Sequence, residues 1–275
     1  MDYSLKKEWN ITNIPAFCIT LERRPDRWKR FQDQSGIKGL QLQRFLGVDG
    51  KTIDIKTDER VATLTKRNII TKSRRSHEEL DSIGGVGCAL SHIAVWKWMV
   101  DNNQPVCLIF EDDAVVPPNF VDRANACIKG SLLQDPKQWD IWLLGGKWDD
   151  MSRIPNSNLI RIEAFVLFHS YVLTLDTAKR LLRDAYPIHA HIDIWVSIYS
   201  YLNGLRIVGS PDMKLLQYQR AKTDIQSEEG CAICNVPTNY QKTYTMVSNA
   251  DLFIMRASEV LVVGLVAYMV YQKWR

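Results

Sequence analysis

The sequence has little net charge, no long apolar run near its start and no regular cysteine framework. Its 275 residues carry a net charge of only +4, and the charged side chains are dispersed, which excludes the basic surface that nucleic-acid-binding proteins need. Residues 1–9 contain no apolar run like that of a secretory signal. The six cysteines are scattered, as is common for reduced thiols. We therefore expect a cytosol-facing globular part with no nucleic-acid partner.

The one close cysteine pair, Cys231 and Cys234, lies in the short motif CAIC. A structural zinc site needs four ligands, and no second pair of Cys or His residues follows. A thioredoxin-like role would need a strand–helix–strand context, which is missing here. The pair is therefore interpreted as a local thiol pair rather than a functional motif.

The C-terminal part contains the longest apolar run. Residues 260–271 are all apolar, but this stretch is shorter than the roughly 20 residues that cross a bilayer as a helix. Extending it back to Leu252 adds Arg256 and Glu259, which are costly near the bilayer centre. Two alternatives remain open: a membrane anchor or interfacial helix, and a helix that packs on the globular part.

Short strand-like runs alternate with amphipathic or apolar helical segments between residues 14 and 210. We expect strands over 14–21, 41–48, 106–110, 139–144, 159–164, 165–175 and 205–208, and helices over 25–34, 88–100, 177–185 and 192–202. This alternation is typical of an α/β fold with a mainly parallel sheet and flanking helices.

The sequence divides into three parts. We expect a domain over residues 12–228, a linker over 229–250 and a hydrophobic C-terminal helix over 251–275. Inside the domain, residues 51–82 are polar and irregular, and loops of such length are usually functional or mobile. This segment is a candidate lid over a ligand.

Three adjacent carboxylates follow the apolar run 106–110. In open α/β sheets, ligands bind beyond the carboxyl ends of the strands, and Glu111, Asp112 and Asp113 would repel one another there without a positive partner. Hard divalent ions such as Mn²⁺ and Mg²⁺ accept one or two carboxylates together with phosphate oxygens. The motif therefore indicates a metal site, although a solvated strand end has the same composition.

The helix before that strand opens with the glycine-rich segment GGVGCALSH, residues 84–92. Glycines at a helix N-terminus let backbone N–H groups approach a phosphate, which makes Gly84 and Gly87 candidate anion contacts. Ser91 and His92 lie in the first turns. A histidine on an apolar helix is, however, more often a hydrogen-bonded core residue than a ligand.

The order of these motifs resembles glycosyltransferase family 25. The resemblance is carried by GGVGCALSHIAVWKWMVDNNQPVCLIFEDDAVVPPNF, and it is supported in order by CITLERRPDRW, FLGVDGK, WDIWLLG and HSYVLTLDTAKRLL. It covers about residues 14–225. The family includes bacterial lipooligosaccharide galactosyltransferases and collagen galactosyltransferases, so the resemblance implies a GT-A-type, Rossmann-like fold that binds a nucleotide-sugar.

The resemblance also implies roles for individual residues. Asp113 would be the direct ligand of Mn²⁺ or Mg²⁺, and Glu111 would lie near the metal or the ribose. Asp193, in the motif HIDIW, would be the general base of an inverting transfer, with Asp149 and Asp150 in reserve; a helix-capping role suits Asp193 equally. The expected contacts to the donor nucleotide or substrate are Arg24, Arg27, Gly84, Gly87, Ser91, His92, Glu111 and Asp112.

Several positions depart from the family pattern. Thr20 stands where the opening strand usually has Asn, Gly47 replaces the usual Ala, and no histidine follows His191 to serve as a further metal ligand.

The activity that the resemblance implies is the transfer of galactose or glucose from a UDP-sugar to a glycan or a hydroxylated protein. The alternative is a family member without catalysis that acts as a carbohydrate-binding or adhesion module. A nucleotidyltransferase is disfavoured because no glycine-rich loop with Lys or Arg follows the first strand.

Overall fold

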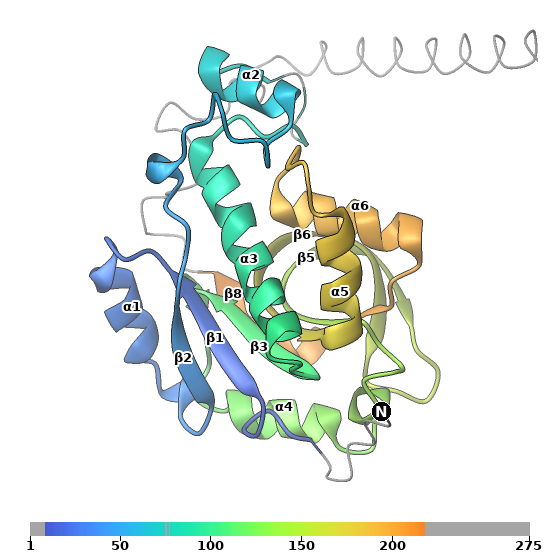
Figure 1. The fold of residues 1–275 in the computed structure, drawn as a ribbon. Helices are drawn as coiled ribbons and strands as arrows, with labels where there is room; N and C mark the ends of the chain where they lie inside the picture. Colours follow the sequence, from blue (N-terminus) through green and yellow to red (C-terminus); the bar gives the residue numbers. More distant parts are fainter. Residues whose placement is uncertain (1–8, 75, 77, 218–275) are drawn as a thin grey trace, which may run out of the picture. The chain divides into compact units, whose positions relative to one another are not determined.

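The computed structural model describes residues 9–74, 76 and 78–217. They form an α/β fold around a six-stranded sheet of order β2-β1-β3-β6-β5-β7 (Figure 1). The strands are β1 Pro15–Thr20, β2 Gln41–Leu46, β3 Val106–Glu111, β5 Ile141–Arg153, β6 Ile160–Thr174 and β7 Ile207–Gly209. A separate two-stranded sheet pairs β4 Ala114–Val115 with β8 Leu216–Gln217.

The sheet is mostly parallel, as predicted, but it is mixed because one strand runs against the others. Strands β2, β1, β3, β5 and β7 run in one direction, and β6 is antiparallel to each strand it pairs with. The predicted strands 159–164 and 165–175 are one long strand, β6. Residues 154–159 connect β5 to β6, and a connection this short joins antiparallel neighbours because parallel strands need a longer crossover.

Helices cover both faces of the sheet. The α-helices are α1 Pro25–Gln32, α2 Thr63–Thr71, α3 Ile83–Asp101, α4 Phe120–Ile128, α5 Leu175–Asp184 and α6 Ile192–Asn203. The 3₁₀ turns are η1 Ser35–Ile37, η2 Gly50–Thr52, η3 Leu132–Gln134 and η4 Pro211–Met213. Two of the helices, α2 and α4, were not expected. Helix α2 lies within residues 51–82, which were predicted to be a polar, irregular segment.

Alternation along β1 divides the core into two clusters. Phe17 and Ile19 pack with α3, α5 and α6 on one face, whereas Ala16 and Cys18 pack with α1 and α4 on the other. Strand side chains alternate between faces, so a strand covered on both sides is apolar throughout. Figure 1 shows α3 and α5 crossing one face of the sheet while α4 lies at the other.

Helix α3 is the central helix and begins earlier than predicted. Its N-cap is Ser82, whose hydroxyl accepts a hydrogen bond from the Gly85 N–H, so the helix starts at Ile83 rather than near residue 88. Among the described residues it is the one helix long and apolar enough to cross a membrane. Its buried side chains, including Trp96 and Met99, account for this apolarity as core packing. The predicted linker 229–250 and C-terminal helix 251–275 lie outside the described residues.

Candidate functional site

The acidic motif lies at the carboxyl edge of the sheet, as the sequence predicted. Glu111 is the last residue of β3, and Asp112 and Asp113 form the turn before β4. The parallel strands β1 and β3 end together, so the segment that leads into α1 lies beside these acids. The three side chains nevertheless have different surroundings.

Asp112 turns toward α1. Its carboxylate pairs with the Arg27 guanidinium at 3.1 Å, and both side chains are about nine-tenths buried. Arg30 donates a hydrogen bond to the Asp112 carbonyl at 3.2 Å. Burial raises the pKa of the Asp112 carboxyl, and the charge of Arg27 opposes that shift. Arg27 therefore has a structural partner within the chain; its contact with nucleotide phosphates stays a prediction.

Arg24 lies at the N-cap of α1 and forms an ion pair with Asp26 at 2.8 Å. The Arg24 guanidinium donates two hydrogen bonds to this carboxylate, and about a fifth of the Arg24 side chain is exposed. Its predicted role in nucleotide binding remains a prediction.

Glu111 faces α3 and meets His92. Its Oε1 atom lies 3.4 Å from His92 Nε2, and the imidazole is fully buried. The other ring nitrogen, Nδ1, lies 2.9 Å from the Tyr171 hydroxyl, which also accepts a hydrogen bond from Trp96 Nε1. Burial raises the pKa of the Glu111 carboxyl, but His92, with His169 and Arg27, brings it below its usual value. The sequence could not show this chain, because its members come from α3, β3 and β6.

Asp113 is the least satisfied of the three acids. Its Oδ2 atom accepts a hydrogen bond from Gln217 of β8 at 3.0 Å, whereas its Oδ1 atom is buried and has no hydrogen-bond partner among the described residues. Burial first, and then the charges of Glu111 and Asp112, raise the pKa of Asp113 to about 7. A buried carboxylate oxygen without a partner is costly, and a divalent cation would satisfy it.

His169 is a site residue that the sequence analysis did not single out. It lies on β6 beside the end of β3, and its Nε2 atom lies 3.2 Å from the Leu215 carbonyl. Its Nδ1 atom is buried without a hydrogen-bond partner among the described residues. Burial lowers the pKa of His169, and the charge of Glu111 opposes that shift. The motif HSYVLTLDTAKRLL, used only as support for the family resemblance, was the available signal.

The glycine-rich start of α3 packs against the turn after β2. A Cβ atom on Gly87 would lie 2.6 Å from the Val48 carbonyl oxygen and 2.7 Å from the Gly50 nitrogen. Ser91 fixes the same contact, because its hydroxyl accepts from the Val48 N–H at 2.8 Å and donates to the Gly87 carbonyl at 2.6 Å. These contacts give Gly87 and Ser91 structural roles, and the predicted anion contacts at Gly84 and Gly87 remain untested.

Asp193, the predicted base, lies in the first turn of α6. Its Oδ2 atom accepts the Leu167 N–H at 2.7 Å, and its Oδ1 atom accepts the Ile194 N–H at 2.9 Å. Leu167 has a φ of 69°, so the carboxylate holds an irregular point of β6. The N-cap residue is His191; Asp193 thus supports α6 and β6 together. Of the reserve candidates, Asp150 pairs with Ala164 within the β5–β6 ladder.

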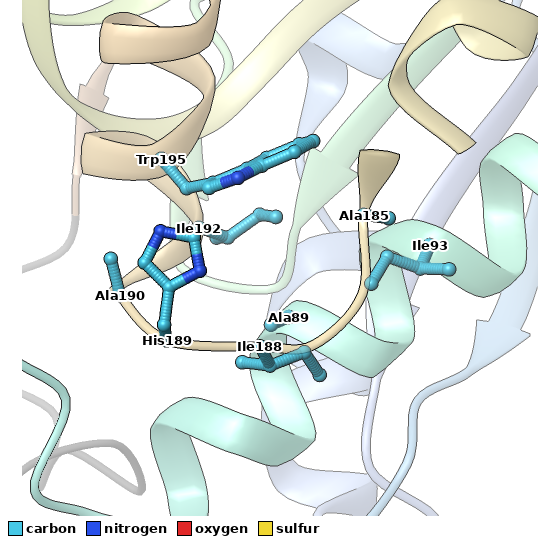
Figure 2. A pocket seen from close by; sticks show the side chains of 8 residues that line it. All are labelled: Ala89, Ile93, Ala185, Ile188, His189, Ala190, Ile192 and Trp195. Carbon is cyan, nitrogen blue, oxygen red and sulfur yellow. The ribbon is translucent and has the colours of Figure 1, made fainter. Parts of the chain in front are cut away.

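A small hollow lies between α3, α6 and the segment that joins α5 to α6. Its volume is about 10 Å³, and it is open to solvent. Figure 2 shows its lining side chains, which are Ala89, Ile93, Ala185, Ile188, His189, Ala190, Ile192 and Trp195. Apart from His189 these residues are apolar or aromatic, and the hollow has room for about one water molecule rather than a sugar ring.

These surroundings fit a divalent cation at the acidic edge. Asp113 offers a buried, unpartnered carboxylate oxygen, and Glu111 offers a second carboxylate two residues before it. Oxygen donors of this kind suit Mn²⁺ or Mg²⁺. Asp112, in contrast, is occupied by Arg27. An α/β sheet with an acidic carboxyl edge is the usual layout of a protein that binds a ligand at that edge.

Comparison with known proteins specifies the family. The profile of glycosyltransferase family 25, described as an LPS biosynthesis protein family, matches residues 13–167. This is more than half of the 275 residues, and the chain belongs to glycosyltransferase family 25.

Three relatives illustrate the range of this similarity. A glycosyltransferase 25 family member of Anopheles gambiae is 31% identical over 175 residues, 61% of this chain and 28% of the relative. Procollagen galactosyltransferase 1 of Danio rerio is 27% identical over 174 residues, 61% of this chain and 28% of the relative. The inactive glycosyltransferase 25 family member 3 of Mus musculus is 26% identical over 185 residues, 65% of this chain and 30% of the relative. The match thus spans less than a third of each relative's length.

Proposed function

We propose that this protein transfers a hexose, galactose or glucose, from a UDP-sugar to a hydroxyl group of a glycan or a hydroxylated protein side chain. Family membership supports glycosyl transfer. The name of the Danio rerio relative supports galactose as the first sugar to test. The donor binds at the carboxyl edge of β1 and β3, and the acceptor approaches from α6.

One observation carries the proposal: the buried, unpartnered Oδ1 of Asp113 beside Glu111. A chain that keeps three acids at the end of a buried strand, with one carboxylate oxygen unsatisfied, accepts a free-energy cost that a bound cation offsets. Asp113 and Glu111 would hold Mn²⁺ or Mg²⁺. The ion supplies positive charge against the diphosphate leaving group.

Residues around these acids position the donor. Arg27 fixes Asp112 through a buried ion pair, which keeps the turn of the acidic motif in place. Arg24, at the N-cap of the same helix, is proposed to bind the diphosphate of the donor. The proposed roles of these two arginines are therefore different: one orients the acids and the other binds phosphate.

Asp193 is the proposed general base. An inverting transfer needs a base on the acceptor hydroxyl, opposite the leaving group. Asp193 lies in the first turn of α6, the element from which the acceptor is proposed to approach. Its two hydrogen bonds with backbone N–H groups leave further lone pairs on both oxygens, so the carboxylate can still accept a proton.

The proposal is tested by UDP release from a panel of UDP-sugars, with and without Mn²⁺, using the full chain and Asp113→Ala. We expect release from one donor that requires both Mn²⁺ and Asp113. Asp176→Ala is the matched control, because Asp176 is a solvent-exposed acid in the first turn of α5 and its loss should leave release unchanged. Equal release by Asp113→Ala and the wild type would contradict the assigned metal site.

A second candidate is a non-catalytic carbohydrate-binding or adhesion module. It is favoured by the backbone hydrogen bonds of Asp193, which give this acid a structural reason to be present. It predicts no UDP release with any donor and no donor binding by calorimetry. Binding of a glycan, with no UDP release and no donor binding, would select this candidate over the transferase.

A further inference from the structure

A second cluster of metal-ligating groups lies next to the acidic motif, and it has different donor atoms. Cys88 and His92 are one helical turn apart on α3, and Glu111 faces them from β3. The ligand atoms of these three residues lie within 4.8 Å of one another.

The spacing within this cluster fits a tetrahedral ion. His92 Nε2 and Glu111 Oε1 are 3.4 Å apart. Two ligands bound at about 2.0–2.2 Å to a tetrahedral zinc ion lie about 3.3–3.6 Å apart. The Nε2 atom is buried and forms no hydrogen bond among the described residues, so its lone pair is available when Nδ1 carries the proton.

The surroundings of His92 supply the outer shell that metal-binding histidines usually have. The Tyr171 hydroxyl lies 2.9 Å from His92 Nδ1, and Trp96 Nε1 donates to the same hydroxyl. A tyrosine oxygen has two lone pairs and can accept from both. An acceptor at Nδ1 fixes the tautomer in which Nε2 binds a metal.

The charge around Cys88 also favours a cation. The carboxylates Glu111, Asp193, Asp113 and Asp112 all act electrostatically on the Cys88 sulfur. A bound divalent ion would offset this negative charge and stabilise the thiolate.

We propose that Cys88, His92 and Glu111 form a zinc-binding site, with a fourth position open to water or a ligand. Sulfur and imidazole nitrogen favour Zn²⁺ over Mn²⁺ or Mg²⁺, which prefer oxygen donors. The site is distinct from the Asp113 site but shares Glu111 with it. We therefore expect bound Zn²⁺ to weaken Mn²⁺ binding at Asp113.

Cobalt is the probe that reports sulfur ligation directly. Co²⁺ is added to the metal-free full chain carrying Cys231→Ser and Cys234→Ser, because the CAIC pair is another source of thiolates. We expect a sulfur-to-cobalt charge-transfer band in the near ultraviolet, which Zn²⁺ abolishes by displacing Co²⁺. Absence of the band in this background overturns the proposal, whatever the further variants show.

Further substitutions assign the ligands. Cys88→Ser should remove the band, and Cys107→Ser, which changes a buried cysteine outside the cluster, should keep it. Asp113→Ala should also keep it, so failure of the Mn²⁺ site and failure of this site are distinguishable. Persistence of the band in Cys88→Ser would overturn the proposal.

Tyr171→Phe provides a test that does not depend on the folding of a Cys88 variant. It leaves all three ligands in place and removes the hydroxyl that is the partner of both His92 Nδ1 and Trp96 Nε1. We expect Zn²⁺ affinity to fall by roughly 10–100-fold, as for the loss of an outer-shell partner. Unchanged Zn²⁺ affinity in calorimetry would contradict the assigned role of His92.

Discussion

At the scale of single residues, the three acids of the Glu111–Asp113 motif have separate environments. Asp112 is neutralised by Arg27, Glu111 faces His92, and Asp113 keeps one carboxylate oxygen unpartnered. Their adjacency and their place after a buried strand could be predicted from the sequence. Their partners could not, because α1, α3 and β8 meet this edge only through the tertiary fold. Acidic residues that are adjacent in the sequence therefore differ in what they can bind.

The raised pKa of Asp113 makes stability depend on pH. Its pKa is about 7 in the folded protein, against 3.8 ordinarily, so the folded state holds this proton more tightly than the unfolded state. The resulting stabilisation is fully present below about pH 4 and is lost as the pH rises through 7. We expect Asp113→Asn, measured by urea unfolding without metal, to be up to about 4 kcal/mol more stable than the wild type above pH 7.

At pH 4 the two proteins should unfold at nearly the same urea concentration, because the wild-type carboxyl is then protonated in the folded state. A difference that stays constant from pH 4 to pH 8 would contradict the assignment of this pKa. Added Mn²⁺ should stabilise the wild type at neutral pH and leave Asp113→Asn unchanged.

Asp193 has a structural and a proposed catalytic role, which one substitution can separate. Asp193→Asn disturbs the hydrogen bonds with Leu167 and Ile194 and should cost about 1–3 kcal/mol of unfolding free energy. Loss of a general base should in addition lower kcat by roughly 10²–10⁴-fold. UDP-sugar turnover measured well below the melting temperature distinguishes the two effects.

Asp176→Asn is the control for that experiment, since it removes an exposed acid from a helix first turn in the same way. A loss of stability in Asp193→Asn with kcat within a few fold of the wild type would restrict Asp193 to its structural role. Another residue would then be the general base.

At the scale of elements, the start of α3 depends on close contact between backbones. Alanine is normally favoured over glycine in a helix by about 1 kcal/mol. Gly87→Ala should nevertheless destabilise the protein by about 1–3 kcal/mol, because its Cβ atom would meet backbone atoms of Val48 and Gly50. Unfolding by urea or heat measures the change.

Gly85→Ala is the matched variant in the same helical turn. Its Cβ atom would meet the tip of the Leu80 side chain and the Ser82 hydroxyl, and side chains can move where a backbone cannot. We expect a clearly smaller loss than in Gly87→Ala. Equal losses would show that the contact with residues 48–50 does not limit this helix.

Some helices and strands could be predicted from the sequence, and others could not. Apolar periodicity placed β1, β3, α5 and α6 within a few residues of their observed bounds. It did not give the direction of β6, because a period of two residues is the same in parallel and antiparallel strands. The short turn-forming segment IPNSN at residues 154–158 was the local signal for an antiparallel hairpin. Helix α2 was missed because its apolar face is small and most of its residues are exposed.

At the scale of the whole molecule, the described elements end at β8, and the described residues of both core clusters all precede it. The predicted domain boundary at residue 228 leaves β8 and its contact with Asp113 intact. A chain ending at residue 228 should therefore fold cooperatively and keep the metal-dependent UDP release proposed for the full chain. The C-terminal residues would then serve location rather than catalysis.

The same pair of proteins tests the two alternatives for the C-terminal apolar run. A membrane anchor or interfacial helix predicts that the full chain sediments with phospholipid vesicles while the chain ending at residue 228 stays in the supernatant. A helix packed on the domain predicts that neither protein binds vesicles and that truncation lowers the melting temperature, because apolar surface on the domain becomes exposed. If the run is a membrane anchor or interfacial helix, truncation leaves the melting temperature in the absence of lipid unchanged. Vesicle binding by both proteins would contradict both alternatives and place the membrane contact within residues 1–228.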